Sequence, residues 1–211
     1  MLDATYSPYP RPMPGTVIIP VKSFSLGKQR LSGVLDPGAR ARLGRALAGH
    51  VAITVAATGR NPHIVTSDPD VAGWAGESGY EVLGDPGGGL SAAARAAVLW
   101  ATHRSKPWLV IHSDLPWLTA DDVGSLMHPL DLGRPVIAPS ADGGTSAIGS
   151  SGDFAFRFGP ASFHHHLAAL GDPVILTRPG LLLDVDAPAD LRAATGSAPG
   201  TWLDEALQPL G

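Results

Sequence analysis

Short apolar segments alternate along this chain with segments of helical periodicity, and this alternation restricts the fold more than any other feature of the sequence. Trp108–His112 is almost wholly apolar, as expected of a strand buried on both faces. Strands separated by helices need crossover connections, which produce an α/β, Rossmann-like fold with a mostly parallel central sheet and helices on both faces. The predicted strands are Val17–Val21, His63–Ser67, Tyr80–Leu83, Trp108–His112, Pro135–Pro139, Val174–Thr177 and Leu181–Asp186.

Start signals mark several of the intervening helices. Asp36 followed by Pro37 combines an N-cap acceptor with a proline in the first turn, and apolar residues then recur at helical spacing. A glycine-rich turn at residues 85–89 precedes an alanine-rich helix, whereas residues 140–146 are too polar and glycine-rich for regular structure. The other predicted helices are Val71–Ser78, Leu90–His103, Thr119–Met127, Ala161–Leu170 and Pro188–Ala194.

The N-terminal segment differs from the rest of the chain. Prolines at 8, 10, 12 and 14 forbid both a helix and a central strand. We therefore expect residues 1–16 to form an extended, proline-rich tail and residues 17–211 to form a single domain. The tail could also pack against a partner subunit, which leaves a homodimer open.

Composition narrows the classes of function. The chain of 211 residues is 44% hydrophobic, with a formal charge of −4, which suits a globular domain and gives no reason to expect nucleic-acid or membrane-surface binding. The absence of cysteine excludes disulfides and thiolate chemistry. No apolar run reaches the roughly 18 to 20 residues of a spanning helix. A cytoplasmic protein is the resulting expectation.

The loop after the first strand carries three cations within nine residues, at Lys22, Lys28 and Arg30. A loop at the carboxyl end of a strand can offer fixed charges and free backbone amides to a polyphosphate. The alternative is a solvated surface loop, because basic loops are common. The loop alone does not decide between the two.

Two groups of aspartates follow predicted strands. Asp114 comes directly after Trp108–His112, where a divalent cation would stabilise its charge; the alternative is a turn or helix cap. Asp184 and Asp186 stand two residues apart on a predicted strand, and we expect only one of them to face a given ligand. The other, with Asp190, would begin the last helix, and a helix start alone would also explain the segment.

Hydroxyl and amide groups gather in residues 142–146 and 157–162, with Ser162 near a predicted helix N-terminus. Together they could cradle an anion, although each alone reads as a turn or an N-cap. Three consecutive histidines, His164–His166, point in different directions on a helix and cannot converge on one ion. The motifs of P-loop NTPases, serine hydrolases and NAD-binding folds are missing.

Taken in order, the motifs resemble one known family. The chain is similar, from about Val17 to Leu191, to the phospholactate or phosphoenolpyruvate guanylyltransferases of deazaflavin coenzyme F-420 biosynthesis. The resemblance rests on Pro20-Val21-Lys22, Lys28-Gln29-Arg30-Leu31, Gly88-Gly89-Leu90, Ser113-Asp114-Leu115-Pro116, Gly144-Thr145-Ser146-Ala147, Arg157-Phe158-Gly159-Pro160 and Asp184-Val185-Asp186-Ala187-Pro188-Ala189-Asp190-Leu191.

The resemblance implies a glycosyltransferase-A-like nucleotidyltransferase fold, GTP as co-substrate, Mg²⁺ as cofactor, and GMP transfer to phosphoenolpyruvate or 2-phospho-L-lactate with release of pyrophosphate. It also implies residue roles. Lys22, Lys28, Arg30 and Asp114 would serve catalysis. The residues expected to bind the nucleotide are Pro20, Lys22, Lys28, Arg30, Gly89, Leu90 and Ser91. Those expected to bind the acceptor acid are Thr145, Ser146, Gly159 and Ser162. The metal ion would be bound by Asp114, Asp184 and Asp186.

Two departures from the family pattern affect specificity. Ser91 and Ser146 stand where the family usually has asparagine, and a hydroxyl offers a different set of hydrogen bonds from an amide. Base or acceptor preference could therefore differ. The rival interpretations are a molybdopterin-type nucleotidyltransferase, whose glycine-rich opening loop is absent here, and a noncatalytic nucleotide-binding module.

Overall fold

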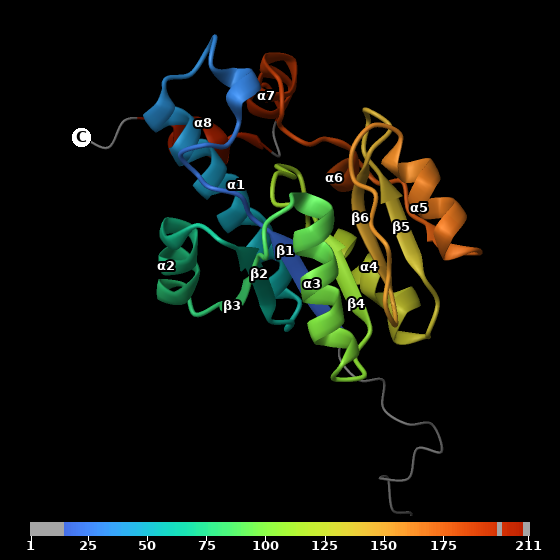
Figure 1. Ribbon diagram of the computed structural model, residues 1–211. Helices are drawn as coiled ribbons and strands as arrows, with labels where there is room; N and C mark the ends of the chain where they lie inside the picture. The colour runs from blue at the N-terminus through green and yellow to red at the C-terminus, as the bar shows by residue number, and fades with distance from the viewer. Residues whose placement is uncertain (1–14, 198–199, 209–211) are drawn as a thin grey trace, which may run out of the picture.

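The computed structural model describes residues 15–197 and 200–208, and a seven-stranded sheet forms its centre (Figure 1). Its strands are β1 (Thr16–Pro20), β2 (Pro62–Thr66), β3 (Glu81–Gly84), β4 (Trp108–Ile111), β5 (Val136–Pro139), β6 (Thr145–Ser150) and β7 (Val174–Ile175). The strand order is β3-β2-β1-β4-β6-β5-β7. β6 runs antiparallel to both of its neighbours, and the other pairs are parallel. The mostly parallel sheet predicted from the sequence is confirmed.

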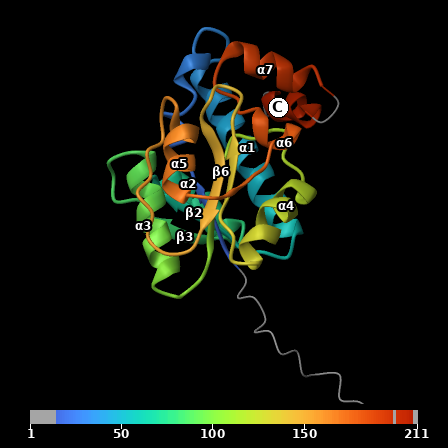
Figure 2. The ribbon, with the colours of Figure 1, turned by 90° about the vertical axis from the view of Figure 1, so that its right-hand side faces the viewer.

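Helices cover both faces of this sheet. They are α1 (Pro37–Ala57), α2 (Pro69–Glu77), α3 (Leu90–Thr102), α4 (Ala120–Asp131), α5 (Ser162–Leu170), α6 (Pro179–Leu182), α7 (Pro188–Thr195), α8 (Trp202–Leu207) and the 3₁₀ helix η1 (Gln29–Leu31). Figure 2 shows α3 and α5 on one side of the sheet and α1 and α4 on the other. No helix in the described ranges has both the length and the apolar character needed to cross a bilayer.

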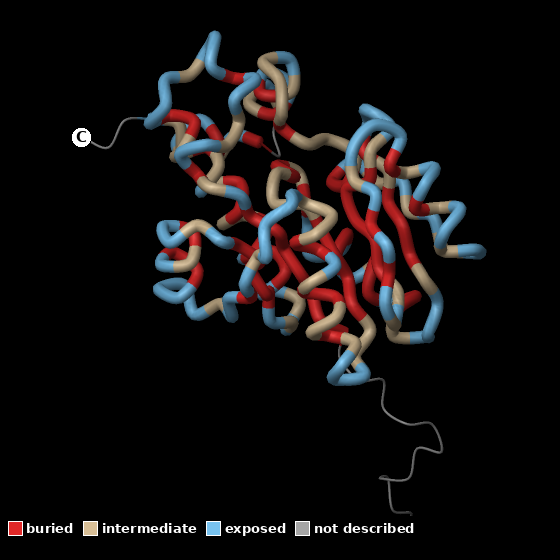
Figure 3. Tube along the Cα trace, in the orientation of Figure 1, coloured by how far each residue is buried: buried red, intermediate tan, exposed pale blue. Residues whose placement is uncertain are grey.

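The sheet divides the apolar core into two layers. In β1, Val17 and Ile19 pack with α1, α2 and α4, whereas Ile18 between them packs with α3. Successive side chains of a strand point to opposite faces, so this central strand must be apolar throughout. The central strands β1, β2 and β4 are accordingly buried at every residue (Figure 3).

A third apolar cluster joins η1, α1, α7 and α8 outside the sheet. Leu31 of η1 and Leu43 of α1 pack with Val185, Leu191 of α7 and Leu203 of α8. In Figure 1 the loop after β1 accordingly lies beside α7 and α8 at the top of the molecule. The cluster therefore fixes the basic loop and the aspartate segment, which are far apart in the sequence, next to one another.

Helix starts agree with the sequence signals. The Asp36 side chain accepts a hydrogen bond from the Ala39 amide at 2.8 Å, with Pro37 at the first helical position. Thr119 accepts from the Asp122 amide while the Asp122 carboxylate accepts from the Thr119 amide, which completes a capping box. Each such cap stabilises its helix by about 1 kcal/mol.

Two predicted elements are wrong. Leu181–Asp186 is not a strand: the short helix α6 ends at Leu182 and an irregular segment follows, because Pro179 begins a helical turn whose Leu181 is fully buried. The predicted loop at residues 140–146 ends early, because β6 begins at Thr145 and pairs with β4 and β5. Small residues suit β6, since a Cβ at Gly149 would lie 2.6 Å from Leu130 Cδ1.

The chain ends differ slightly from expectation. β1 begins at Thr16, one residue inside the predicted tail, and the prolines of that tail lie outside the described residues. Helix α8 was not predicted, and it packs on α1 through Leu203.

Candidate active site

A cavity of about 620 Å³ opens where β1 and β4 end and β6 begins. It lies at the carboxyl ends of the parallel strands, where α/β sheets bind ligands. Most of the predicted site residues line it: Pro20, Lys22, Lys28, Arg30, Leu90, Asp114, Thr145, Gly159, Ser162, Asp184 and Asp186. Gly89, Ser91 and Ser146 are not among the residues that line it.

Lys28 is the centre of the charged part of this cavity. Its ammonium lies 2.6 Å from Asp114 Oδ2 and 3.0 Å from Asp186 Oδ1, and the side chain is only 11% exposed. Its backbone is left-handed, with φ 52°. Non-glycine residues rarely adopt this conformation, and such strain persists where the surrounding structure imposes it, often at functional sites. Lys28 thus joins two carboxylates that are 72 residues apart in the sequence.

The charges of this group stabilise one another. Burial lowers the pKa of Lys28, but Asp114 and Asp186 outweigh burial and leave that pKa above its ordinary value. Burial likewise raises the pKa of Asp114, but Lys28 and His112 outweigh it and hold the pKa below its ordinary value. Lys28 and Asp114 are therefore both charged at neutral pH.

Asp184 has a different environment. Burial, followed by the charges of Asp114 and Asp142, raises the pKa of Asp184 to about 7. The expectation that only one of Asp184 and Asp186 can face the ligand is wrong, since both line the cavity. Residues two apart share a face even in a regular strand, so strand geometry would not have separated these two side chains. Neither residue caps α7; Asp190 does so by accepting from the amides of Asp186 and Ala187.

The carboxylates of the cavity could hold a divalent ion only with help from a bound ligand. Within residues 15–197 and 200–208, no three aspartate, glutamate, histidine or cysteine side chains form a ready metal site. However, the buried Oδ1 of Asp114 has no hydrogen-bond partner among the described residues. Mg²⁺ is usually held by one or two carboxylates together with substrate phosphates. The donor set therefore fits an ion that is bound jointly with a phosphorylated ligand.

Hydroxyl groups line the other end of the cavity. Ser162 begins α5 and donates to Thr145 Oγ1 at 3.2 Å, and both side chains are almost completely buried. Gly159 lies on the segment before α5, with φ 132°, a conformation that favours glycine. The hydroxyl groups of Thr145 and Ser162 can form hydrogen bonds with an anion at this end.

The two serines that depart from the family pattern are engaged inside the protein. Ser91 Oγ accepts from the Phe158 amide at 3.0 Å, which ties the start of α3 to a segment that lines the cavity. Ser146 is fully buried, and its hydroxyl lies 3.3 Å from the carbonyl oxygens of Ala138 and Pro139. Gly89, with φ 87°, forms the N-cap position of α3.

Sequence reasoning missed several residues that line the cavity, and His112 is one of them. His112 lines it between the aspartates and the hydroxyl end, with its ring 5.2 Å from that of Phe158. Its Nε2 is buried and has no hydrogen-bond partner in the described part of the chain. The sequence offered only its position two residues before Asp114, which does not distinguish it from a strand residue.

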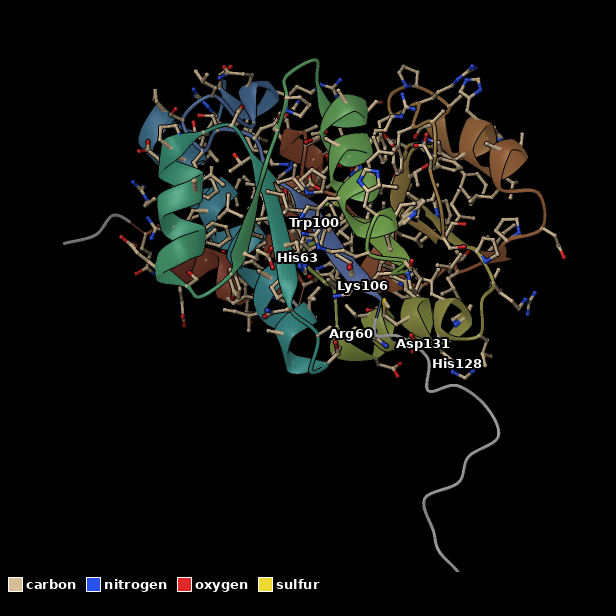
Figure 4. All side chains as sticks on the ribbon, turned by 60° about the horizontal axis from the view of Figure 1, so that its bottom comes forward. Arg60, His63, Trp100, Lys106, His128 and Asp131 are labelled. Atoms are coloured by element: carbon tan, nitrogen blue, oxygen red, sulfur yellow. The ribbon has the colours of Figure 1, made fainter. Side chains whose placement is uncertain are left out.

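Polar residues at the opposite edge of the sheet pair with one another instead (Figure 4). Arg60 donates to Asp131 at 2.7 Å. His63 lies 3.3 Å from Glu81, and its ring centre is 5.0 Å from that of Trp100. None of these residues lines the 620 Å³ cavity. These contacts indicate that the residues have a structural role and do not belong to the candidate active site.

Comparison with known proteins adds independent information. A family model described as "Guanylyl transferase CofC like" matches residues 15–173. The phosphoenolpyruvate guanylyltransferase of Sphaerobacter thermophilus is 35% identical over 199 residues, covering 89% of this chain and 96% of the relative. The 2-phospho-L-lactate guanylyltransferase of Methanothermobacter thermautotrophicus is 28% identical over 204 residues, covering 92% of this chain and 89% of the relative.

Solved structures share the fold at lower identity. A protein of Desulfovibrio desulfuricans described as a nucleotide-diphospho-sugar transferase superposes with a TM-score of 0.73 at 19% identity, covering 92% of this chain and 96% of that one. A Mycobacterium tuberculosis protein solved in complex with manganese gives a TM-score of 0.58 at 18% identity, covering 88% and 100%. These likenesses confirm the predicted glycosyltransferase-A-like nucleotidyltransferase fold.

Proposed function

The chain belongs to the CofC-like guanylyltransferase family, and on that premise we propose that it transfers GMP from GTP to phosphoenolpyruvate or 2-phospho-L-lactate. Pyrophosphate is the second product, and the reaction is a step of coenzyme F-420 biosynthesis. The observation that carries the proposal is the meeting of the basic loop, the aspartates and the hydroxyl-lined end in one cavity.

The basic loop binds the triphosphate in this proposal. Lys22, Lys28 and Arg30 all line the cavity and supply positive charge to a ligand that carries several negative charges. Lys28 is held between Asp114 and Asp186, and phosphate oxygens offer its ammonium alternative partners. Gly89 and Leu90 form the start of α3, beside which the guanosine would lie.

Asp114 and Asp186 are the proposed ligands of Mg²⁺. They already converge on one cation, the Lys28 ammonium, so their oxygens can share a second one. Asp184 lies in the same cavity and is the third candidate ligand. A bound Mg²⁺ ion would neutralise phosphate charge that builds up as the bond to pyrophosphate breaks.

The reaction needs positioning and charge neutralisation rather than a protein nucleophile. A phosphate oxygen of the acceptor acid attacks the α-phosphorus of GTP, and a new phosphoanhydride bond forms. The bond between the α-phosphorus and the bridging oxygen to the β-phosphate breaks, and pyrophosphate leaves with that oxygen and its electron pair. Thr145 and Ser162 hold the acceptor acid at the far end of the cavity.

Pyrophosphate release by the purified protein with Mg²⁺ tests this function. Each of the four NTPs is combined with phosphoenolpyruvate, 2-phospho-L-lactate or 3-phosphoglycerate. Release with GTP and only one of the first two acids would support the proposal and identify the acceptor. Release with none of the pairs from a folded protein would overturn it. We also propose that this activity is cytoplasmic.

A further inference from the structure

His166 is the one histidine of the His164–His166 run that is fully buried, while the other two are exposed. It lies on α5 and makes two hydrogen bonds through its ring. Its Nδ1 is 3.0 Å from Thr145 Oγ1, and its Nε2 is 2.9 Å from the Arg157 amide nitrogen. The ring thus connects β6 to the segment that leads to Gly159.

These contacts determine which ring nitrogen carries the proton. The Arg157 amide can only donate, so Nε2 must be the unprotonated acceptor. Burial, with contributions from the charges of His112 and His165, lowers the pKa of His166 to about 4, so the ring is neutral at physiological pH. Its single proton therefore lies on Nδ1 and is donated to Thr145 Oγ1.

The hydroxyl group of Thr145 can then form only one more hydrogen bond, in which it is the donor. A hydroxyl oxygen accepts two hydrogen bonds and donates one. Thr145 Oγ1 accepts from His166 Nδ1 and from Ser162 Oγ, and neither contact uses the hydroxyl hydrogen of Thr145 itself. Because Thr145 lines the cavity, this hydrogen is left for a ligand.

We propose that His166 is a positioning residue that makes Thr145 an obligate hydrogen-bond donor, so that the acceptor acid must present a hydrogen-bond-accepting oxygen, such as one of its carboxylate or phosphate oxygens, at this point of the cavity. The inference rests on the proposed function and specifies how the acceptor is recognised. A ligand hydroxyl that needs an acceptor there is rejected, because both lone pairs of Thr145 are already used.

The same histidine holds a second part of the acceptor end. Arg157, which donates to its ring, is followed by Phe158, whose amide donates to Ser91 at the start of α3. The segment before Gly159 is therefore fixed at two successive amides, one on the side of α5 and one on the side of α3. His166 consequently orders both the hydroxyl and the loop that face the acceptor.

Steady-state kinetics of three variants test this role. His166→Leu removes both ring bonds and should raise the KM of the acceptor acid at least about tenfold, since a hydrogen bond to a charged group loses its alignment. The KM of GTP should stay within about twofold of wild type. His166→Asn keeps a donor near Thr145 and should recover most of the loss. His165→Leu changes an exposed neighbour on the same helix and should leave both KM values unchanged.

A double variant shows whether His166 acts through Thr145. Thr145→Val removes the hydroxyl at nearly constant volume and should itself raise the KM of the acceptor acid. Adding His166→Leu to Thr145→Val should raise that KM by much less than the product of the two separate effects, because only the contact with the Arg157 amide is still there to lose. Independent, multiplied effects, or equal increases in the KM of GTP, would overturn the inference.

The tautomer can be measured without catalysis. ¹⁵N spectra of the wild-type histidines, assigned by the signal lost in His166→Asn, should show a neutral ring with the proton on Nδ1. A proton on Nε2 would overturn the inference, even if His166→Leu failed to fold. An active enzyme with that tautomer would refute this inference alone, whereas a wild-type protein that transfers GMP to no acid would refute the proposed function.

Discussion

Replacing Lys28 by methionine gives a prediction whose size and pH dependence follow from the structure. The substitution keeps an unbranched side chain at a left-handed backbone position, so the backbone strain is unchanged. It removes the ammonium that lies 2.6 Å from Asp114 and 3.0 Å from Asp186. Two neighbouring carboxylates are then left without their cation.

The expected loss of stability comes mainly from Asp114. Breaking a fully buried ion pair by removing one partner costs about 3–5 kcal/mol. Here Asp114 is 18% and Asp186 49% exposed, so water in the cavity solvates part of the charge. We expect a loss of about 2 kcal/mol in the free energy of unfolding at neutral pH, after this screening is taken into account. For a chain of this size that corresponds to a fall in Tm of about 4–8 °C.

The loss should depend on pH with a defined sign. In the wild type the pKa of Asp114 is lowered by folding, so its contribution is complete above the unfolded value of about 3.9 and is lost as pH falls through the folded value. The pKa of Lys28 is raised by folding, so its contribution is lost only as pH rises through its folded value. In Lys28→Met, burial acts on Asp114 without its main compensating charge, and its pKa rises. The deficit should therefore shrink on acidification.

Urea denaturation in the presence of a chelator, at about pH 7.5 and about pH 5, measures this effect. Lys22→Met is the matched control, because Lys22 lines the same cavity but is exposed and should change the free energy of unfolding by less than about 0.5 kcal/mol. Wild-type stability of Lys28→Met at the higher pH would refute the reasoning. So would a deficit that is equal at both pH values.

Three further substitutions separate chemistry from folding. Asp114→Asn should lower kcat at least about a hundredfold with a native circular dichroism spectrum; near-wild-type turnover would exclude Asp114 from the chemistry. Ser162→Ala should raise the KM of the acceptor acid about tenfold and leave that of GTP unchanged, because Ser162 bonds Thr145; parallel increases would contradict the assignment. Thr119→Ala removes the α4 cap and should cost about 1 kcal/mol in urea denaturation with unchanged kinetics; unchanged stability would exclude the cap.

Much of the fold could be predicted from local signals in the sequence. Asp36-Pro37 marks the start of α1 because the cap and the proline act within one turn of the chain. The apolar segment at Trp108–Ile111 marks the buried strand β4 because both of its faces meet helices. In contrast, Leu181–Leu183 is equally compatible with a strand and a helical turn, and only burial against the core decides in favour of α6.

Most of the predicted site residues line the cavity, but the contacts between its side chains could not be predicted. Lys22, Lys28, Asp114 and Ser162 stand in motifs that adjoin strand or helix ends, where ligands bind. The bond between His166 and Thr145 could not be predicted, because it depends on how α5 packs against β6. The same is true of Ser91, whose partner Phe158 lies 67 residues away.

The central claim is the formation of a new anhydride between GMP and the acceptor acid, and ³¹P NMR of the reaction mixture tests it most directly. With GTP, Mg²⁺ and the accepted acid, the account predicts two mutually coupled phosphorus resonances from one product, together with an equal amount of pyrophosphate. Pyrophosphate accompanied only by free GMP would mean hydrolysis rather than transfer, and that result would contradict the account.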